Sequence, residues 1–448
     1  MLKLRKDFCD RHLLAFVFLA GLAIRLLWQL EVYGSLTLFA GWGEASNVAL
    51  ALSQGRGFAD AFYPGYGPTA HLLPLNPLAA SFWLWTFGPQ SAGANLGLIL
   101  LSLGQVGLGY WLLMRLFQRL GLELSAVRWS IILLCVFPFF VQTEVIAFRY
   151  WEGATALCLM CVNMLRLIEL DERPEIRIRD LVIIATLSAM TIFVSIPVGF
   201  GVVMCWSFFA LRRLTLKQIG QLTLAGALAL GVLVGPWTIR NELALGHPVL
   251  LRSNAGLELA LANHPAAVSG ENPEAVLAAR AAEIHPFTGM RARDALRSAG
   301  GEVLYSQSLG AATRSWIISN PSDFATLSLR HLRQFYFPDS WQFALSEPDG
   351  RPLEGAIWVS LVNLAGLLAL LVGLVQRRKG YAMLATCLVC ITLIYICTQP
   401  TLRYTYLVYG PLLFLAVDGI VRSWRRAIDI LSSRRFGQFL PSRPGPIA

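Results

Sequence analysis

The chain has 448 residues, of which 56% are hydrophobic and only 14% are charged, and its formal net charge is +10. Soluble domains are typically about 45–50% apolar and about 25% charged, so the composition excludes an ordinary soluble enzyme and indicates an integral membrane protein. The 37 basic residues are scattered between apolar segments, which fits Lys and Arg retained in cytoplasmic loops and argues against a nucleic-acid partner.

Apolar segments recur along the chain at about 20 residues each, the length of a helix that crosses a bilayer. They predict an all-α polytopic membrane protein, because barrel strands would be about half as long and alternating. The clusters of Lys and Arg all fall on one side of the spans, so the N-terminus is expected in the cytoplasm. The first apolar run is long enough to span, and we expect a retained helix rather than a cleaved signal. About ten spans fit, at 13–33, 92–115, 129–147, 150–168, 181–195, 197–211, 219–236, 356–375, 381–398 and 404–421.

Two stretches of mixed polarity separate these spans, and both are expected on the periplasmic side. The first loop, 34–90, contains two short segments at 44–54 and 74–87 with the character of amphipathic surface helices. The second of them carries Trp83 and Trp85, as an interface helix would. The predicted units are 1–236 for the membrane core with its first loop, 237–354 for a periplasmic segment between spans seven and eight, 355–421 for the C-terminal spans and 422–448 for a cytoplasmic tail.

Two features inside the apolar segments need an explanation. Arg25 lies within the first span, so it is expected to face the bundle interior or a wet cavity, or to snorkel outward. The C-x-x-C pairs 158/161 and 387/390 have no His or acid nearby in sequence, and buried packing is expected for them rather than metal binding.

Glu44 and Glu152 are the acids that invite a catalytic hypothesis, because each flanks a span on the outer side in a short connection. Two carboxylates that converge on one cavity could serve as a base and a positioning group. The alternative is that both are solvated interfacial acids. Asn47 lies one helical turn after Glu44, and the Gly-Arg-Gly-Phe turn with Arg56 follows, so substrate contacts are expected in this loop.

Two arginines at the outer ends of spans suit a phosphate group. Arg403 is followed by Tyr404 in a very short turn before the last span, and Arg240 ends the seventh. A guanidinium can donate two parallel hydrogen bonds to phosphate. Ordinary interfacial snorkelling is the alternative.

Histidine spacing does not indicate a metalloprotease, and no P-loop, G-x-S-x-G or kinase motif is present. Three histidines, His71, His264 and His285, could meet in the outer region. No metal site is predicted from the sequence, although a divalent metal remains an open alternative.

Several short motifs occur in a shared order. The first loop reads E-x-x-x-V-A-x-x-L-x-x-G-x-G-F from Glu44 to Phe58. The others are Gly67-Pro68-Thr69-Ala70, Pro74-Leu75-Asn76-Pro77, Trp151-Glu152, PWTIRN (236–241), LLRSNAGLELALAN (250–263), His285-Pro286, Gly301-Glu302, Asn320-Pro321 and Arg403-Tyr404. On these motifs the chain resembles bacterial membrane glycosyltransferases of the GT-C class, in the branch similar to glycosyltransferase family 39 and to dolichyl-phosphate-mannose-protein mannosyltransferases.

The resemblance implies a GT-C-like bundle with surface helices over a cavity, and inverting transfer of a sugar from a polyprenyl-phosphate carrier to an envelope acceptor. It implies Glu44 as the catalytic base, with Glu152 as a candidate second acid because Gly43 stands where many members have another acid. It implies Arg403 as the ligand of the carrier phosphate, with Thr405-Tyr406 where relatives often continue with Arg and Pro. His71 and Trp151 are further candidate substrate contacts, and Trp42, Phe58, Tyr63 and Tyr66 could stack on the sugar.

Two rival functions stay open. A polysaccharide polymerase or ligase would use a pyrophosphate-linked donor and would also suit a large basic outer segment. A transporter of lipid or sugar would be expected to show inverted repeats, which are not visible in the sequence.

Overall fold

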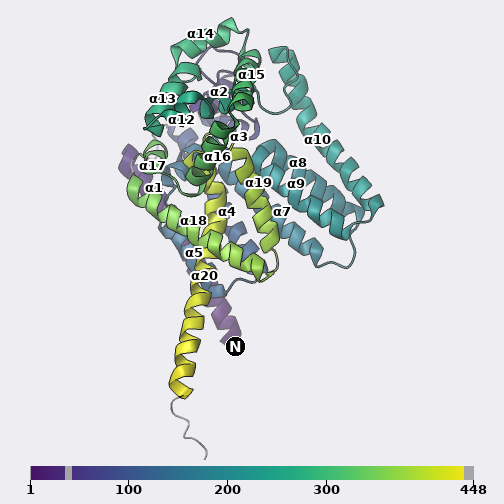
Figure 1. Ribbon diagram of the computed structural model, residues 1–448, viewed down its shortest axis with the longest axis vertical. Helices are drawn as coiled ribbons and strands as arrows, with labels where there is room; N and C mark the ends of the chain where they lie inside the picture. The colour runs from purple at the N-terminus through teal and green to yellow at the C-terminus, as the bar shows by residue number, and fades with distance from the viewer. Residues whose placement is uncertain (1, 36–42, 349, 438–448) are drawn as a thin grey trace, which may run out of the picture.

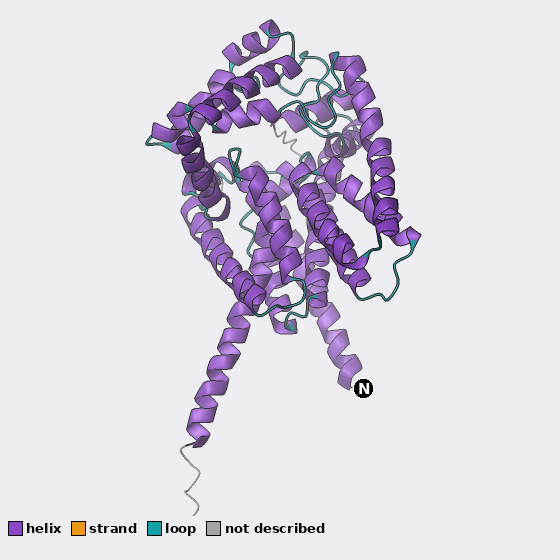
Figure 2. Ribbon diagram, turned by 45° about the vertical axis from the view of Figure 1, so that its right-hand side comes forward, coloured by secondary structure: helices purple, strands orange, loops and turns teal. Residues whose placement is uncertain are grey.

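The computed structural model describes residues 2–35, 43–348 and 350–437, and within these every regular element is a helix (Figure 2). The predicted all-α class is confirmed. The helices that precede the outer segment are α1 (Leu2–Tyr33), α2 (Gly43–Ser53), α3 (Leu75–Phe87), α4 (Ala92–Arg119), α5 (Leu124–Val136), α6 (Val141–Val145), η1 (Ala147–Arg149), α7 (Gly153–Asp171), α8 (Ile178–Val194), α9 (Ile196–Arg213) and α10 (Leu216–Leu245). The outer segment holds α11 (Ala255–Ala262), α12 (Pro265–Ser269), α13 (Pro273–Ile284), α14 (Met290–Ser298), α15 (Glu302–Ser319), α16 (Pro321–Tyr336) and α17 (Ser340–Ser346), and α18 (Pro352–Val375), α19 (Tyr381–Tyr395) and α20 (Leu402–Gly437) follow.

The helices identify a multi-pass membrane protein. Seven described helices are long and apolar enough to cross a bilayer, or eight if a bent pair counts as one span. They are α1, α4, α7, α9, α10, α18 and α20, and the bent pair is α5 with the segment Val141–Arg149. The shorter α19 is also apolar, and α8 lies beside α9 and α10. The expected number of about ten spans stays a prediction.

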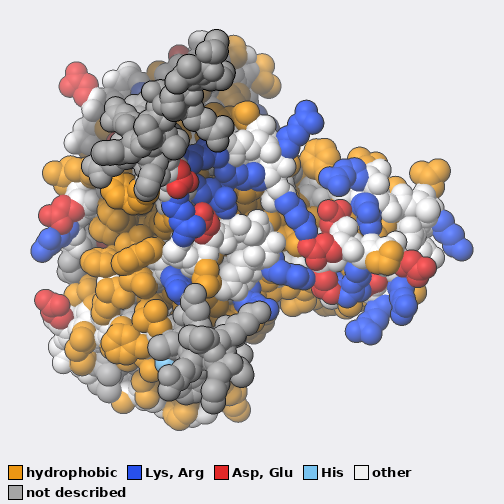
Figure 3. Space-filling model, turned by 90° about the horizontal axis from the view of Figure 1, so that it is seen from below, with side chains coloured by type: hydrophobic (Ala, Val, Ile, Leu, Met, Phe, Trp, Pro, Cys, Tyr) orange, Lys and Arg blue, Asp and Glu red, His pale blue; other side chains and the backbone are white. Residues whose placement is uncertain are grey.

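The bundle has two distinct ends. The start of α1 and the last turns of α20 lie at the lower end, and α12–α15 lie at the opposite end (Figure 1). Lys and Arg side chains gather over the lower face (Figure 3). This distribution fits the expected cytoplasmic side, so the first loop and the outer segment would face the periplasm.

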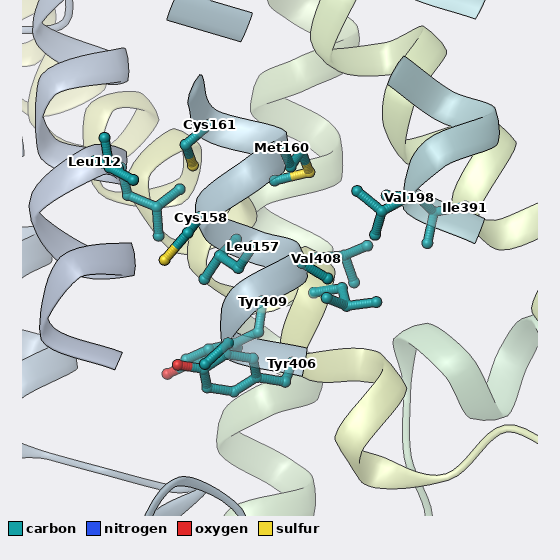
Figure 4. Close-up of a cluster of buried hydrophobic side chains, with 14 of the residues drawn as sticks. Leu112, Leu157, Cys158, Met160, Cys161, Val198, Ile391, Tyr406, Val408 and Tyr409 are labelled. Atoms are coloured by element: carbon teal, nitrogen blue, oxygen red, sulfur yellow. The ribbon is translucent and has the colours of Figure 1, made fainter. Parts of the chain in front are cut away.

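The bundle core is apolar and continuous between α4, α7, α9, α19 and α20. Leu157, Val198, Ile391 and Val408 are almost completely buried there (Figure 4). Cys158 and Cys161 of the first C-x-x-C pair are free thiols within the same core. Their packing role follows from burial among hydrophobic neighbours.

The predicted span 129–147 is interrupted. Helix α5 ends at Val136, and the chain bends by 79° before Val141–Arg149. Pro138 explains the break, because proline lacks an N–H and disfavours the helical conformation at the preceding Phe137. The buried carboxylate of Glu347 then accepts hydrogen bonds from the backbone N–H of Gln142 (2.7 Å) and Thr143 (2.9 Å) at the start of α6.

Arg25 faces the bundle interior. Its Nε donates to Glu144 Oε2 at 2.7 Å, and its Nη1 donates to the carbonyl oxygen of Cys135 at 2.9 Å. The Tyr110 hydroxyl donates to the other oxygen of Glu144. Glu144 is therefore the buried counter-ion of the first helix.

Helix α10 is longer than the predicted span 219–236. It passes through Pro236 and ends at Leu245, where Gly246 adopts φ 70°. A glycine in this left-handed conformation is the commonest way to end a helix. The additional turns carry Arg240 to the level of the first loop, where it binds that loop.

Candidate active site

The first outer loop is a closed structure rather than an open connection. The Asp60 N–H donates to the Gly67 carbonyl at 2.8 Å, and the Thr69 N–H donates to the Phe58 carbonyl at 3.1 Å. The Asp60 carboxylate also accepts the Gly67 N–H at 2.9 Å. Gly67 has φ 101°, which a residue with a side chain rarely adopts. These bonds present Thr69 and His71 toward the rest of the outer region.

Glu302 clamps this loop to the outer segment. Its buried carboxylate accepts hydrogen bonds from Thr69 Oγ1 (2.7 Å), the Ala70 N–H (2.6 Å) and Ser253 Oγ (2.8 Å). Burial raises the pKa of Glu302, although these three donors oppose the shift. The clamp joins segments 232 residues apart in the sequence and fixes the backbone next to His71.

Arg240 is a second clamp on the same loop. Its Nη1 donates to the Thr69 carbonyl at 2.6 Å, and its Nη2 donates to the Phe58 carbonyl. The guanidinium also lies over the rings of Phe58 and Trp237, at 5.6 and 5.3 Å. The arginine expected to bind substrate is thus engaged by backbone carbonyls in this structure, where it holds the loop in place.

Glu44, His71 and His285 converge in front of this loop. Nε2 of His285 lies 3.5 Å and Nε2 of His71 lies 4.0 Å from the same oxygen, Oε1 of Glu44. Burial, followed by the charges of His285, Arg252 and Arg403, lowers the pKa of His71 well below its ordinary value, so this imidazole is neutral at neutral pH. These three side chains are the described group that could hold a metal ion, and His264 is not part of it.

Glu152 forms an ion pair with Arg252, a residue from the loop after α10. Burial lowers the pKa of Arg252, but the charge and hydrogen bond of Glu152, together with Tyr404 and Tyr395, raise this pKa overall. The pair is mostly buried, with side-chain exposures of 18% and 24%. Glu152 is therefore a counter-ion in this structure rather than a solvated interfacial acid.

Arg403, at the start of α20, stacks on Trp151. Its Cζ lies 4.1 Å from the indole centroid, and its Nη2 donates to the Tyr404 hydroxyl at 3.3 Å. The Tyr404 ring stacks in turn on Tyr395, with centroids 4.2 Å apart. A small pocket opens beside this stack, lined by Phe148, Trp151, Glu152, Gly153, Ala156, Ser195, Tyr395, Arg403, Tyr404 and Leu407.

Four buried donors around this stack have no hydrogen-bond partner among the residues that the structure describes. They are Nε of Arg403, Nε of Arg252, Nε1 of Trp151 and Oγ1 of Thr401. An unsatisfied buried donor typically costs about 1–3 kcal/mol, and more when it is charged. Because two of the donors belong to guanidinium groups, an anion with several oxygens is the ligand that would satisfy them best.

The carboxylate and the guanidinium parts of the site belong together. Arg403 interacts electrostatically with Glu44, and His71 interacts with both Arg252 and Arg403. The site therefore contains a carboxylate with two imidazoles and, in electrostatic contact with them, guanidinium groups beside an aromatic pocket.

The archaeal oligosaccharyltransferase AglB from Archaeoglobus fulgidus, solved with an inhibitory peptide and a dolichol-phosphate, aligns over 99% of this chain and 53% of its own at 14% identity, with a TM-score of 0.50. The chain has a GT-C-like fold. It spans about half the length of AglB. ArnT from Cupriavidus metallidurans, bound to undecaprenyl phosphate, aligns over 91% of this chain and 78% of its own at 13% identity, with a TM-score of 0.36. In sequence, no protein-family model and no curated protein matches.

The GT-C resemblance drawn from the motifs is confirmed at the level of the fold. The GT-C-like chain brings Glu44, His71, Trp151, Glu152 and Arg403 into one region. Tyr404 belongs to the same stack. Asn47 donates to the Ala61 carbonyl at 3.2 Å and ties α2 to its own loop. Arg56 is paired with Asp60 and half exposed, so its described contacts are local.

Among the expected sugar-stacking aromatics, Phe58 packs edge-on against Trp237 with centroids 4.9 Å apart. Tyr63 lies under the guanidinium groups of Arg293 and Arg297, at 4.8 and 5.4 Å. Trp42 lies outside the described residues. These aromatics hold parts of the outer region together in the structure, and their sugar contacts remain a prediction.

Three residues of the candidate site received no role from the sequence. Arg252 lies within the string LLRSNAGLELALAN and Glu302 follows Gly301, so both were part of the motifs, but nothing in the sequence indicated their partners. Thr401 precedes Leu402 in the turn before α20. Its involvement depends on where that turn meets Arg403, which only the folded chain defines.

Proposed function

We propose that this protein is a membrane glycosyltransferase that moves a sugar from a polyprenyl-phosphate carrier to an acceptor of the cell envelope, on the periplasmic face of the inner membrane. The observation that carries the proposal is the group of unpartnered buried donors that includes Nε of Arg403, whose guanidinium interacts electrostatically with the carboxylate of Glu44. The GT-C-like fold is consistent with it, and AglB was solved with a dolichol-phosphate, a lipid of this class.

In the proposed reaction, Glu44 accepts the proton of an acceptor hydroxyl. The hydroxyl oxygen forms a bond to C1 of the sugar while the bond from C1 to the phosphate oxygen breaks, and polyprenyl phosphate leaves with the electron pair. Attack from the side opposite the phosphate inverts the anomeric centre. Arg403 and its neighbouring donors stabilise the charge that grows on the phosphate, which is the usual role of preorganised donors in group transfer.

The pocket between Phe148, Tyr395 and Leu407 has a volume of only about 20 Å³, so it would have to widen to admit the first prenyl unit of the carrier. It is aromatic and apolar, and it adjoins Arg403, so a lipid lying in it would have its phosphate at the unpartnered donors. A monophosphate is favoured over a pyrophosphate because Arg252 is already neutralised by Glu152, whereas Arg403 stacks on an uncharged ring.

The test is mass spectrometry of envelope glycans and lipid-linked sugars in a deletion strain and its complemented derivatives. We expect one glycan modification to be lost and a polyprenyl-phosphate-linked sugar to accumulate. The wild-type gene should restore the modification, and Glu44→Gln at the same protein level should not. Accumulation of a pyrophosphate-linked oligosaccharide would instead indicate a polymerase or ligase, and unchanged glycans would refute the proposal.

A further inference from the structure

We propose that a groove at the basic end of the bundle, between α7, α9 and α19, binds one anionic glycerophospholipid of the surrounding membrane. The lipid phosphate would lie against Arg212 and Lys379, and one acyl chain would lie in the deeper part of the groove. The site does not depend on the proposed glycosyltransferase function, because it uses none of the residues of the candidate active site.

The groove lies where the ends of three membrane helices meet. Helix α9 packs against both α7 and α19. Helices α7 and α9 end here, and α19 begins here after the turn that follows α18, at the lower end of the bundle (Figure 1). The groove has a volume of about 340 Å³, within the range of about 300–1,000 Å³ that is usual for ligand pockets. It therefore has room for part of a lipid.

The walls of the groove change from charged to apolar with depth. In α9, Arg212 lies at the rim, Phe208 lies one turn deeper and Cys205 two turns deeper, on one face of the helix. On the opposite wall, Lys379 precedes α19 and Met383 lies one turn deeper. Seven residues of helix rise by about 10 Å. The groove thus pairs a charged rim with an apolar wall of about that depth, as a phospholipid pairs its headgroup with a chain.

Close packing of α9 on α19 closes the deep end of the groove. The Cys205 thiol donates to the Met383 carbonyl oxygen at 3.3 Å. A Cβ atom at Gly201 would lie 2.9 Å from the Cys387 carbonyl oxygen, so the two backbones touch one turn beyond Cys205. At the open side, by contrast, the Phe208 side chain is 53% exposed. The groove therefore has a closed floor and one side that faces the membrane.

The rim carries more positive than negative charge. Two adjoining segments contain six basic residues, 212–217 and 377–379. The acids beside them are Asp171, which lies 3.7 Å from Arg212, and Glu172, which pairs with Lys379. Both ion pairs are exposed, and exposed ion pairs contribute little to stability. Arg212 and Lys379 can therefore turn toward a phosphate at little cost.

An anionic lipid fits this combination better than a soluble anion or a neutral lipid does. Basic pockets between membrane helices on the positively charged side are typical sites for anionic headgroups. A soluble anion would leave the apolar wall uncovered, whereas a chain covers it with van der Waals contacts. A zwitterionic headgroup would bring a second cation to a rim that is already basic.

A lipid in the groove would have a structural effect. The groove is formed by helices that are separate in the chain, so its occupant would bridge them. A ligand that binds the folded state stabilises that state by mass action. Phosphatidylglycerol should therefore raise the melting temperature of the protein in detergent more than phosphatidylcholine does.

The test is native mass spectrometry of the full-length protein, delipidated in detergent and titrated with phosphatidylglycerol or with phosphatidylcholine of the same chains. We expect one phosphatidylglycerol to bind, with a preference of at least about fivefold over phosphatidylcholine. Arg212→Ala should weaken its binding about fivefold, and the double variant with Lys379→Ala about 25-fold, because each basic residue near an anionic lipid typically contributes about that factor. The matched control is Arg179→Ala, an exposed arginine in the first turn of α8 that does not line the groove. It should change the affinity by less than about twofold, since distant surface charges are screened.

Ala382→Trp tests the position of the chain. Ala382 is exposed within the groove, so a large ring there should fill the space without removing a charge. Binding should fall by at least about tenfold, because the ring and a lipid chain cannot share the groove. Unchanged thermal unfolding without lipid shows that this variant retains its fold. Equal binding of the two lipids, wild-type affinity in the double variant, or wild-type affinity in Ala382→Trp would each refute the site.

Discussion

Arg403 stacks on Trp151 with its guanidinium carbon 4.1 Å from the indole centroid, and each of the two side chains holds a buried N–H without a partner among the described residues. Both residues line the same small pocket. An anion that accepted both of these hydrogen bonds would complete the arrangement, as the proposed function requires.

Arg403→Ala should lower the specificity constant for sugar transfer by about 10- to 150-fold, the usual range for a lost hydrogen bond to a charged group. Arg403→Lys should be clearly impaired as well, because lysine retains the charge but neither the fork nor the flat stack. Trp151→Phe should retain the stack and lose only one N–H, with a smaller effect. The control is Arg314→Ala in α15, which changes an exposed arginine. A wild-type rate of transfer by Arg403→Ala would show that Arg403 has no role in binding the donor phosphate.

Glu44→Gln should reduce transfer by about 10²–10⁴, the typical contribution of general-base catalysis. Glutamine is nearly isosteric, so binding of the polyprenyl-phosphate donor should change much less. The measurement is turnover and donor affinity of the purified variant in detergent. Near-normal turnover would remove Glu44 from the mechanism.

Glu152→Gln should behave differently, because it releases Arg252 from its ion pair. A free Arg252 adds positive charge beside the pocket, so donor affinity should change together with rate. An effect on rate alone, as large as that of Glu44→Gln, would assign the proton transfer to Glu152 instead.

Glu302→Ala should lower the thermal stability of the outer region, since it leaves Thr69, Ala70 and Ser253 without their common acceptor. Each unsatisfied buried donor typically costs about 1–3 kcal/mol. Glu302→Gln retains one acceptor oxygen and should be less damaging. Thermal unfolding in detergent measures both variants, and equal melting temperatures for wild type and Glu302→Ala would contradict the role of the clamp.

Glu347 should make stability depend on pH. Burial raises its pKa to about 8, although the N–H groups of Gln142 and Thr143 oppose the shift. Because the unfolded chain releases this proton near the ordinary value of 4.5, the free energy of unfolding should fall by about 1.4 kcal/mol per pH unit as pH rises between the two values. Above about pH 8 the contribution should be constant.

Thermal unfolding of the wild type and Glu347→Gln across this range of pH tests the assignment. The glutamine variant cannot titrate, so its pH slope should be shallower. Parallel slopes for the two proteins would show that Glu347 does not titrate in this window.

Alkaline-phosphatase fusions test the orientation of the chain. A fusion at Ser269 should be active and one at Pro174 inactive, because the basic loops are expected in the cytoplasm. Activity at Pro174 would place Glu44 on the cytoplasmic side, where a periplasmic transfer reaction could not use it.

Much of the helical architecture could be predicted from hydrophobicity alone. The surface helix predicted at 74–87 is α3, Leu75–Phe87. Its Phe82 and Trp85 are exposed, as expected for a helix that lies along the membrane interface. The bend after Val136 was missed, although Phe137-Pro138 is a local signal for it. Hydrophobicity is continuous across this bend, so a criterion based on apolar length predicts one uninterrupted span.

The site was predictable in its residue types and much less so in its pairings. Glu44 and Arg403 could be selected because their chemistry suits transfer from a phosphate. The partner of Glu152, by contrast, is 100 residues away, and the partner of Ala70 is 232 residues away. Such pairings depend on how helices and loops meet in three dimensions, and one sequence carries no periodic pattern that encodes them.

The ion pair of Arg25 with Glu144 links the membrane insertion of α1 to that of a segment synthesised 119 residues later. A lone guanidinium at the centre of a helix costs about 2.5–3.5 kcal/mol on insertion scales. Helix α1 therefore reaches its final depth most favourably once its counter-ion has left the ribosome. For the same reason α1 cannot be replaced by a helix made only of leucine. Such a helix would leave the buried Glu144 carboxylate without its counter-ion, which typically costs about 3–5 kcal/mol.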